Sequence, residues 1–314
     1  MPTAPPPDFA AALAAGPLVL DGGMFNQLAA AGHDLSDALW SARLLADDPE
    51  AVVAAHRAYF AAGAEVAITA SYQASFEGFA RRGVGHAAAA RLLASSVELA
   101  REAVRAEPGG RRRWVAASVG PYGAVLADGS EYRGRYGLSH AELVAFHRPR
   151  LEVLAAARPD VLALETVPDA DEARALLALV RGTGVPAWLS YSVADGRTRA
   201  GQPLAEAFAL AAEVDEVLAV GVNCCTPRDV DLAVAVAAQV TGKPVVVYPN
   251  SGERWDADRR DWRGEPTFRS ARVGGWLADG ARLVGGCCRI GTDGIAALAA
   301  EVAVRRGVLS GVDG

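Results

Sequence analysis

The chain has 314 residues, of which 51% are hydrophobic and 22% are charged, so its composition is that of an ordinary globular protein. Its 31 basic and 37 acidic residues give a net charge of −6, which argues against binding to a nucleic-acid backbone. No apolar run reaches the roughly 18 residues of a membrane-spanning helix, and the N-terminus lacks a basic leader. We therefore expect a cytoplasmic protein that binds neither membranes nor nucleic acid.

The predicted elements alternate between strands and helices along the chain. Residues 1–14 begin with a Pro-rich stretch, where we expect a disordered tail. Eight short apolar runs with little polar alternation then predict strands that are buried on both faces, at 18–21, 66–71, 114–119, 161–165, 187–192, 217–223, 244–248 and 282–286. Helical patterns separate them, at 39–46, 50–62, 86–106, 139–157, 170–180, 203–212, 227–240, 270–278 and 292–308.

Eight strands that alternate with helices predict an α/β protein of the (β/α)8 type, a TIM barrel, because such barrels typically need about 250 residues. We expect one domain over residues 15–310, since no linker-like stretch divides the chain. The competing interpretation is a doubly wound open sheet. That fold usually carries a Gly-rich fingerprint after its first strand, and Asp21-Gly22-Gly23 does not have that spacing.

Candidate site residues stand at the carboxyl ends of the predicted strands, where chemistry collects in a barrel. Glu165 ends an apolar run, where a charge without a partner is costly, so it is the stronger of two candidate carboxylates. Asp21 is the weaker one, because an aspartate at a strand–helix turn is often only a helix cap.

The four cysteines form two adjacent pairs, Cys224-Cys225 and Cys287-Cys288, after the sixth and eighth predicted strands. Alternate strands of a barrel share a layer of side chains, so these thiols can converge and offer a soft-ligand site for Zn²⁺. Strand alternation lets only one of the first pair face the site, whereas Gly285-Gly286 lets the backbone bend and present both sulfurs of the second pair. Three ligands with one exchangeable position is therefore the favoured count.

Other interpretations of the cysteines stay open. An isolated cysteine is usually a small buried hydrophobe, and adjacent cysteines can form a vicinal disulfide or a thiol relay, although no C-x-x-C motif is present. A barrel whose zinc is structural and whose partner is another protein is a further alternative.

The strand-end motifs together resemble the homocysteine S-methyltransferase family, which also includes betaine–homocysteine and selenocysteine methyltransferases. The resemblance runs from about Leu18 to the last helix, and Gly221-Val222-Asn223-Cys224 with Gly285-Gly286-Cys287-Cys288 is its most specific part. It implies a barrel that holds Zn²⁺ with Cys224, Cys287 and Cys288, and it leaves Cys225 as a bystander. The remaining matching segments are 21–23, 39–42, 69–75, 120–123, 165–166 and 248–253.

The resemblance is to the short bacterial and plant type, which implies methyl transfer from a sulfonium donor, S-methylmethionine or S-adenosylmethionine, to homocysteine, giving methionine. A related thiol or selenol acceptor is the alternative. Glu165 and Asp21 are expected to bind the ammonium group of the substrate. Backbone N–H groups between Ser71 and Ser75 are expected to bind its carboxylate. Asn223 is expected to orient the substrate or the ligand loop. Gly22 and Gly23 complete the expected substrate site. An aromatic wall suits a sulfonium cation, and its candidates are Trp40, Tyr72, Tyr122 and Tyr248.

Overall fold

Eight parallel strands form a barrel in the computed structural model, which describes residues 8–35, 39–108, 111–256 and 261–310. Around the barrel the strands follow the order β1-β12-β9-β8-β5-β4-β3-β2, and a bridge between Leu20 and Val66 joins the two ends of this sheet. The predicted (β/α)8 barrel is therefore confirmed. The strands are β1 (Leu18–Val19), β2 (Val66–Ile68), β3 (Trp114–Val119), β4 (Val161–Val167), β5 (Ala187–Tyr191), β8 (Val217–Asn223), β9 (Val245–Tyr248) and β12 (Ala281–Val284).

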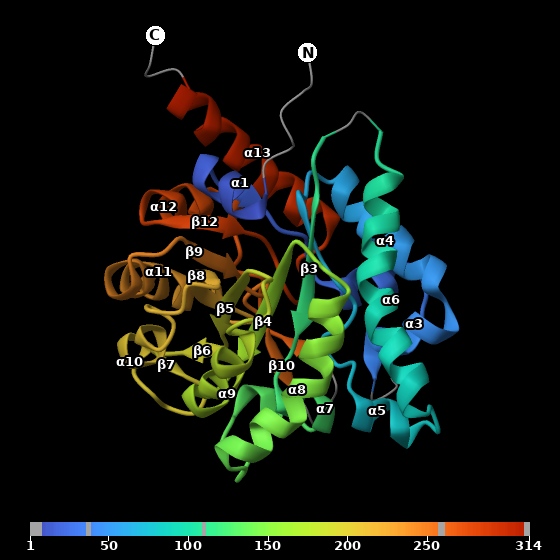
Figure 1. Cartoon of the computed structure of the whole chain (residues 1–314). Coiled ribbons are helices and arrows are strands. Elements are labelled where there is room, and N and C mark those ends of the chain that lie inside the picture. Colours follow the sequence, from blue (N-terminus) through green and yellow to red (C-terminus); the bar gives the residue numbers. More distant parts are fainter. Residues whose placement is uncertain (1–7, 36–38, 109–110, 257–260, 311–314) are drawn as a thin grey trace, which may run out of the picture.

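Helices surround the strands on the outside (Figure 1). One of these helices begins with a capping box, because Ser139 Oγ accepts from the Glu142 N–H at 3.3 Å and the Glu142 side chain accepts from the Ser139 N–H at 2.8 Å. The main helices are α4 (Pro49–Ala61), α6 (His86–Arg105), α8 (His140–Ala156), α9 (Ala170–Val180), α10 (Leu204–Ala209), α11 (Pro227–Thr241), α12 (Val273–Ala278) and α13 (Thr292–Ser310). None of the helices in the described part of the chain is long and apolar enough to cross a membrane.

The strand side chains divide into two cores because successive residues point to opposite faces. One core lies between strands and helices, and the other fills the barrel interior. On β4 the interior series begins with Val161 and Ala163, and its next member is Glu165. On β8 it passes Ala219 and Gly221 to Asn223. Each apolar series thus ends in a polar residue at the carboxyl end, which is how the barrel places its site.

The N-terminal helix α1 (Phe9–Ala15) closes the end of the barrel opposite the carboxyl ends of the strands (Figure 1). The expectation of a disordered tail over residues 1–14 is wrong from residue 9 onward; residues 1–7 lie outside the described structure. Asp8 caps the helix by accepting from the Ala11 N–H at 2.8 Å. Phe9 and Leu13, one turn apart, are buried in the interior core, and the Phe9 ring meets Trp114 edge-on at 6.2 Å.

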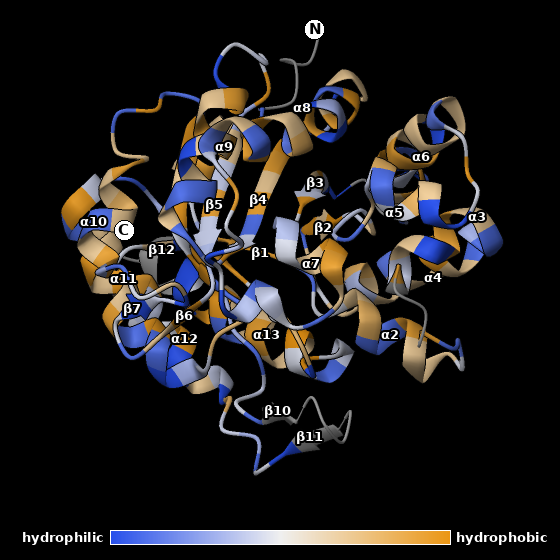
Figure 2. Ribbon diagram, turned by 90° about the horizontal axis from the view of Figure 1, so that it is seen from below, coloured by the Kyte–Doolittle hydropathy of each residue, from blue (hydrophilic) through white to orange (hydrophobic). Residues whose placement is uncertain are grey.

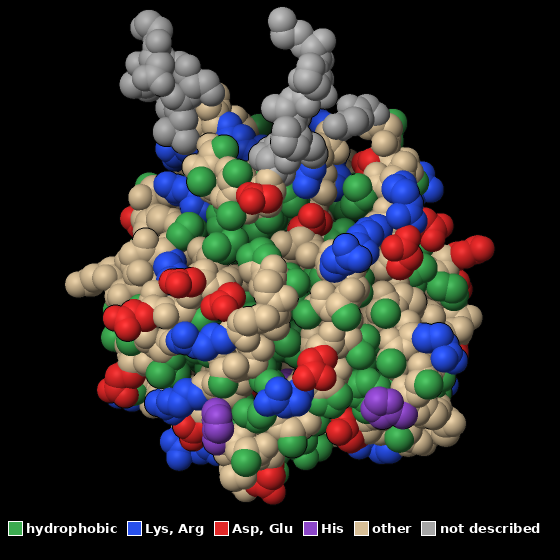
Figure 3. All heavy atoms as spheres, viewed as in Figure 1, with side chains coloured by type: hydrophobic (Ala, Val, Ile, Leu, Met, Phe, Trp, Pro, Cys, Tyr) green, Lys and Arg blue, Asp and Glu red, His purple; other side chains and the backbone are tan. Residues whose placement is uncertain are grey.

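Short elements that the sequence did not predict occupy the loops after the strands, and Figure 2 shows α2 and α7 around the carboxyl end of the barrel. They are α2 (Met24–Ala30), α5 (Phe76–Arg81), α7 (Tyr122–Leu126), η2 (Ser130–Tyr132), β6 (Val193–Ala194), β7 (Arg197–Thr198), β10 (Arg254–Asp256) and β11 (Asp261–Arg263). The predicted helices at 39–46 and 270–278 each begin with a 3-10 turn, η1 (Trp40–Arg43) before α3 (Leu44–Asp47) and η3 (Ser270–Arg272) before α12. On the outer surface, acidic and basic side chains are interspersed over the face shown in Figure 3.

The packing of α1 predicts that Leu13→Ala lowers the free energy of unfolding by about 2–5 kcal/mol, because it leaves a cavity in a buried core. Urea unfolding followed by circular dichroism measures this loss. Val304→Ala on α13 is the control, since Val304 is 63% exposed and its truncation is expected to change stability by about 0.5 kcal/mol or less. Equal effects of the two substitutions would contradict the packing of α1 against the barrel.

Candidate functional site

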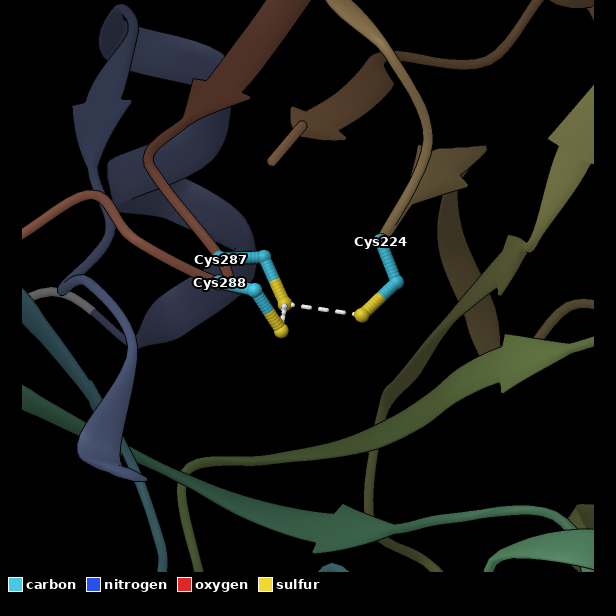
Figure 4. Close-up of side chains that lie close together, drawn as sticks. All are labelled: Cys224, Cys287 and Cys288. Carbon is cyan, nitrogen blue, oxygen red and sulfur yellow. Dashed lines mark hydrogen bonds between the residues drawn. The ribbon is translucent and has the colours of Figure 1, made fainter. Parts of the chain in front are cut away.

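Three cysteine sulfurs meet at the carboxyl end of the barrel (Figure 4). Cys224 follows β8, whereas Cys287 and Cys288 follow β12. The Sγ atoms of Cys224 and Cys287 are 2.9 Å apart, those of Cys287 and Cys288 are 4.0 Å apart, and all three lie within 4.8 Å of one another. The three residues expected as ligands are therefore brought together by the fold.

The loop after β9 ties the two cysteine segments together, since β9 lies between β8 and β12 in the sheet. The Cys224 N–H donates to the Tyr248 carbonyl at 3.2 Å, and the Cys288 N–H donates to Asn250 Oδ1 at 3.0 Å. Cys224 adopts a φ of +48°, a conformation that non-glycine residues rarely hold without surrounding support. The backbone around the sulfurs is thus fixed before any ligand binds.

The donor set fits a thiophilic metal ion. Tetrahedral zinc with bonds of about 2.3 Å places its sulfur ligands about 3.8 Å apart. The separation between Cys287 and Cys288 matches this value, whereas the sulfurs of Cys224 and Cys287 must separate by about 0.9 Å when a zinc ion binds between them. Because Cys287 and Cys288 are half-buried, a ligand can reach the sulfurs.

The thiols cannot all ionise at once without a cation. Hydrogen bonds from the thiols of Cys224 and Cys287 lower the pKa of Cys288 well below its usual value. The pKa of Cys287 is raised instead, first by its hydrogen bond to Cys224 and then by its bond to Cys288 and by burial. A bound divalent cation deprotonates coordinating thiols outright, so the cluster has the chemistry of a metal site.

Cys225 points away from this cluster and lies in the hydrophobic core between strands and helices. Burial raises the pKa of its thiol, which keeps it in the neutral form. This placement agrees with its expected part as a bystander.

Glu165 is buried at the carboxyl end of β4 and faces the barrel interior. It accepts a short hydrogen bond from the Ser118 hydroxyl, and the phenol of Tyr248 also bonds to it. Burial raises the pKa of Glu165 to about 7, although both hydrogen bonds favour the charged form, and the nearby Cys224 adds to the rise. A cation beside this carboxyl group would stabilise its charge.

Asp21 is the second buried carboxylate and follows β1. Its Oδ2 accepts from the Ile68 N–H at 2.8 Å, whereas its Oδ1 is buried without a hydrogen-bond partner. Burial raises the pKa of Asp21 well above its usual range, and the charge of Glu165 raises it further. Two carboxylates that oppose each other's ionisation in this way form a site for a cationic group.

Asn223 holds the carboxyl end of β4. Its Oδ1 accepts from the Thr166 N–H at 2.7 Å and from the Ser190 hydroxyl at 2.9 Å, and its Nδ2 donates to Thr166 Oγ1 at 2.7 Å. Thr166 has a φ of +58°, so these bonds stabilise an unusual backbone conformation directly after Glu165. Asn223 therefore orients the end of β4, which carries Glu165.

The other residues expected at the substrate site are held by contacts within the protein. The Ser71 hydroxyl donates to the Ser118 carbonyl at 2.8 Å, and Ser75 caps α5 by accepting from the Gly78 N–H at 2.9 Å, so both hydroxyls are engaged within the protein. Gly22 and Gly23 lie against the segment after β12, where a Cβ on Gly23 would approach the Cys287 carbonyl to 2.8 Å. This close contact requires glycine beside the cysteine loop.

The four aromatic candidates for a sulfonium wall are placed differently. Tyr72 lies near Cys224 and Glu165, whose charges act on its phenol. Tyr248 is inside the barrel, where its OH accepts from the Trp188 indole N–H at 3.0 Å and bonds to Ser190 at 2.8 Å, and it also supports Glu165. The ring of Tyr122 packs against two aromatic rings of the neighbouring segments, at 4.9 and 5.2 Å. Trp40 begins η1, and its side chain lies outside what the structure describes.

Comparisons with known proteins agree with this geometry. A family model for homocysteine S-methyltransferase matches residues 18–302, which is most of the chain. The chain belongs to the homocysteine S-methyltransferase family.

Two bacterial members of the family are similar over nearly their whole length. The chain is 44% identical to homocysteine S-methyltransferase YbgG of Bacillus subtilis, with 90% of the chain and 93% of that protein covered. It is 46% identical to homocysteine S-methyltransferase of Escherichia coli, with 90% and 94% covered. The crystal structure of the metallated E. coli homocysteine methyltransferase MmuM superposes with a TM-score of 0.82 at 43% identity, covering 91% of this chain and 96% of that one.

Two residues of this methyltransferase-family site were not predicted from the sequence. Tyr132 places its OH 3.6 Å from Cys224 Sγ, and Glu131 beside it is buried. Both belong to η2, more than ten residues after the end of β3. The distance in sequence from a strand end does not predict the position of a residue this far into a loop. The sequence therefore shows that a glutamate and a tyrosine are present but not that they lie at the site.

Arg150 was also not predicted, although it joins the loop after β2, which contains Tyr72, to the loop after β3. Fully buried on α8, it donates to the Gly120 carbonyl at 3.0 Å, to the Tyr72 carbonyl at 3.0 Å and to the Ser71 carbonyl at 3.4 Å. Its guanidinium also lies over the Phe146 ring, 5.7 Å from the centroid. A planar fork with several donors is the group that can serve carbonyls of two loops at once.

We expect Arg150→Lys to lower the free energy of unfolding by about 1–3 kcal/mol, because a single ammonium group leaves buried carbonyls without a donor. Chemical denaturation measures the change. Arg148→Lys on the same helix is the matched control, since the Arg148 side chain is 56% exposed and pairs only loosely with Glu152 at 3.7 Å. Equal denaturation midpoints for the two variants would show that the buried guanidinium group of Arg150 does not stabilise the loops.

Proposed function

We propose that the chain transfers a methyl group from a sulfonium donor, S-methylmethionine or S-adenosylmethionine, to homocysteine and so produces methionine. The observation that carries this proposal is the convergence of three thiols with two buried carboxylates at one end of the barrel. Homocysteine carries a thiol and an ammonium group, and these are the two groups that such a site can bind together.

The proposed cofactor is Zn²⁺, held by Cys224, Cys287 and Cys288. Support comes from the sulfur donor set and from the metallated crystal form of the E. coli relative. A bound zinc ion with one exchangeable position would bind the homocysteine sulfur and keep it as a reactive thiolate at neutral pH. The sequence contributes no fourth cysteine to the cluster, because Cys225 is in the core.

The chain's own residues would orient homocysteine through its amino-acid end. Glu165 and Asp21 would bind the ammonium group, with Ser118 and Tyr248 holding the Glu165 carboxylate in place. Backbone N–H groups of the loop after β2 would bind the carboxylate, and Arg150 holds that loop through its carbonyls. These contacts would fix the substrate sulfur beside the three cysteine sulfurs.

The methyl transfer itself needs no acid from the protein. The bond between the donor sulfur and its methyl group breaks as the homocysteine sulfur attacks the methyl carbon, and the donor leaves as a neutral thioether. Tyr72 at the sulfur cluster would supply an aromatic surface for the sulfonium cation, together with Trp40. The five histidines are therefore not required as general acids.

A selenol acceptor is the second candidate. The chain is 39% identical to selenocysteine Se-methyltransferase of Brassica oleracea, with 93% of the chain and 90% of that protein covered. We further propose that the protein acts in the cytoplasm on small molecules alone, without nucleic acid or membrane, where its four free cysteines would stay reduced.

Substituting the ligands tests the proposal directly. Cys287→Ser is expected to lower zinc content from about one ion per chain to a small fraction and to abolish methionine formation from homocysteine and S-methylmethionine. Elemental analysis and a chromatographic methionine assay measure the two effects. Cys225→Ser is the matched control and should keep both properties; full activity of metal-free Cys287→Ser would refute the proposal.

The raised pKa of Glu165 predicts a pH dependence of product binding. Methionine carries no thiol proton, so its affinity reports the carboxylate rather than sulfur ionisation. With a pKa of about 7, Glu165 is charged in about one tenth of the molecules at pH 6 and nine tenths at pH 8, so affinity should rise about tenfold over this range. Calorimetric titration measures it; a dependence that persists unchanged in Glu165→Gln would contradict the assignment.

A further inference from the structure

Glu131 is a third carboxylate at the sulfur end of the barrel, and neither the metal site nor the acceptor site uses it. The residue is 6% exposed, and its Oε2 is buried without a hydrogen-bond partner. Its backbone is fixed, because its carbonyl accepts from the Ser192 hydroxyl at 3.2 Å. The next residue, Tyr132, reaches Cys224 Sγ with its phenol, so the segment lies against the cluster.

No basic group among the residues that the structure describes forms an ion pair with Glu131. Arg133 is exposed and faces Asp128 at 3.8 Å, and Arg199 lies over the Tyr132 ring, 5.6 Å from its centroid. A carboxylate oxygen that is kept out of water without a hydrogen bond is costly, and the support for the charge of Glu131 comes from its own backbone N–H and from the charge of the exposed Arg133. A buried carboxylate beside the sulfur cluster is therefore suited to bind a cationic group of a ligand.

Building on the proposed function, we infer that Glu131 binds the α-ammonium group of the methyl donor. The acceptor's ammonium group already has Glu165 and Asp21, on β4 and after β1. Glu131 comes from η2, a different segment, yet it lies close enough to Cys224 and Tyr72 for their charges to interact. It is thus placed for a second amino acid that meets the first at the sulfurs.

The chemistry favours the ammonium over the sulfonium as the partner of Glu131. The sulfonium charge disappears as the methyl group leaves, so a carboxylate against it would stabilise the bound donor more than the transition state. The ammonium charge does not change during the reaction, and three carbon atoms separate it from the sulfur in both proposed donors. A carboxylate directed at the ammonium therefore improves donor binding without opposing methyl transfer.

The test compares S-methylmethionine with its des-amino analogue, 4-(dimethylsulfonio)butanoate, in the wild-type chain and in Glu131→Gln. The wild type should prefer S-methylmethionine by at least tenfold in kcat/KM. Glu131→Gln should lose most of this preference through a higher KM for S-methylmethionine, while the KM for homocysteine and kcat/KM for the analogue stay unchanged. Glu152→Gln, an exposed carboxylate on α8, is the matched control.

Several results would overturn the inference. A wild type that uses both donors equally would exclude recognition of the ammonium group, even if Glu131→Gln failed to fold. Equal losses with both donors would assign Glu131 to the sulfonium, and a raised KM for homocysteine would assign it to the acceptor. Failure of the proposed function looks different, since the wild type would then form no methionine; calorimetric titration of S-methylmethionine into both proteins would still decide whether Glu131 binds it.

Discussion

The hydrogen-bond network that supports the buried carboxylate of Glu165 sets the rest of the site. An apolar barrel can retain a carboxylate at its carboxyl end only if neighbouring strands supply donors. Here β3 supplies Ser118 and β9 supplies Tyr248, and the same network continues through Ser190 to Asn223. Because Asn223 directly precedes Cys224, the network that holds the carboxylate also fixes the start of the segment that carries the first sulfur. The buried carboxylate and the sulfur cluster therefore share one framework.

The strands were predictable because buried β-branched runs mark them, and these runs predicted β3 and β8 to the residue. Alternation also predicted that only one of Cys224 and Cys225 faces the site, and the family resemblance identified it as Cys224. In the structure Asn223 continues the inward series of β8. Cys224 then leaves the strand conformation with a φ of +48°, and its sulfur lies in the cluster while Cys225 lies in the core. Residues that reach the site from loops were not predictable in this way. Glu131 stands in η2, and a loop has no periodicity that reports where a side chain points. Tyr122 begins α7 and its ring packs on other aromatic rings, and the sequence pattern did not report these contacts.

The prediction of a disordered N-terminal tail relied on composition and missed the local pattern of a helix. The Pro-rich start suggested a tail, yet Asp8 is a good cap and Phe9 and Leu13 stand one turn apart, which is the spacing of a short amphipathic helix. Arg150 could not be predicted in this way, since no sequence pattern separates a buried arginine on a helix from an exposed one. The reason for its burial is seen only in the folded chain, where carbonyl groups of two loops accept hydrogen bonds from it. Tertiary contacts, rather than local sequence, decide such residues.

The charge balance of the site connects stability with function. Glu165 has a pKa of about 7 in the folded chain and an ordinary value near 4.5 when exposed, so the folded state holds its proton more tightly than the unfolded state. Stability from this group is therefore present at low pH and is lost as the pH rises from about 4.5 through about 7. Asp21 and Glu131 act in the same direction, because burial raises the pKa of each. Cationic ligands reverse this loss by binding the charged forms. A site with three such carboxylates beside three thiols is thus destabilising when empty, and the proposed metal ion and ammonium groups would offset this cost.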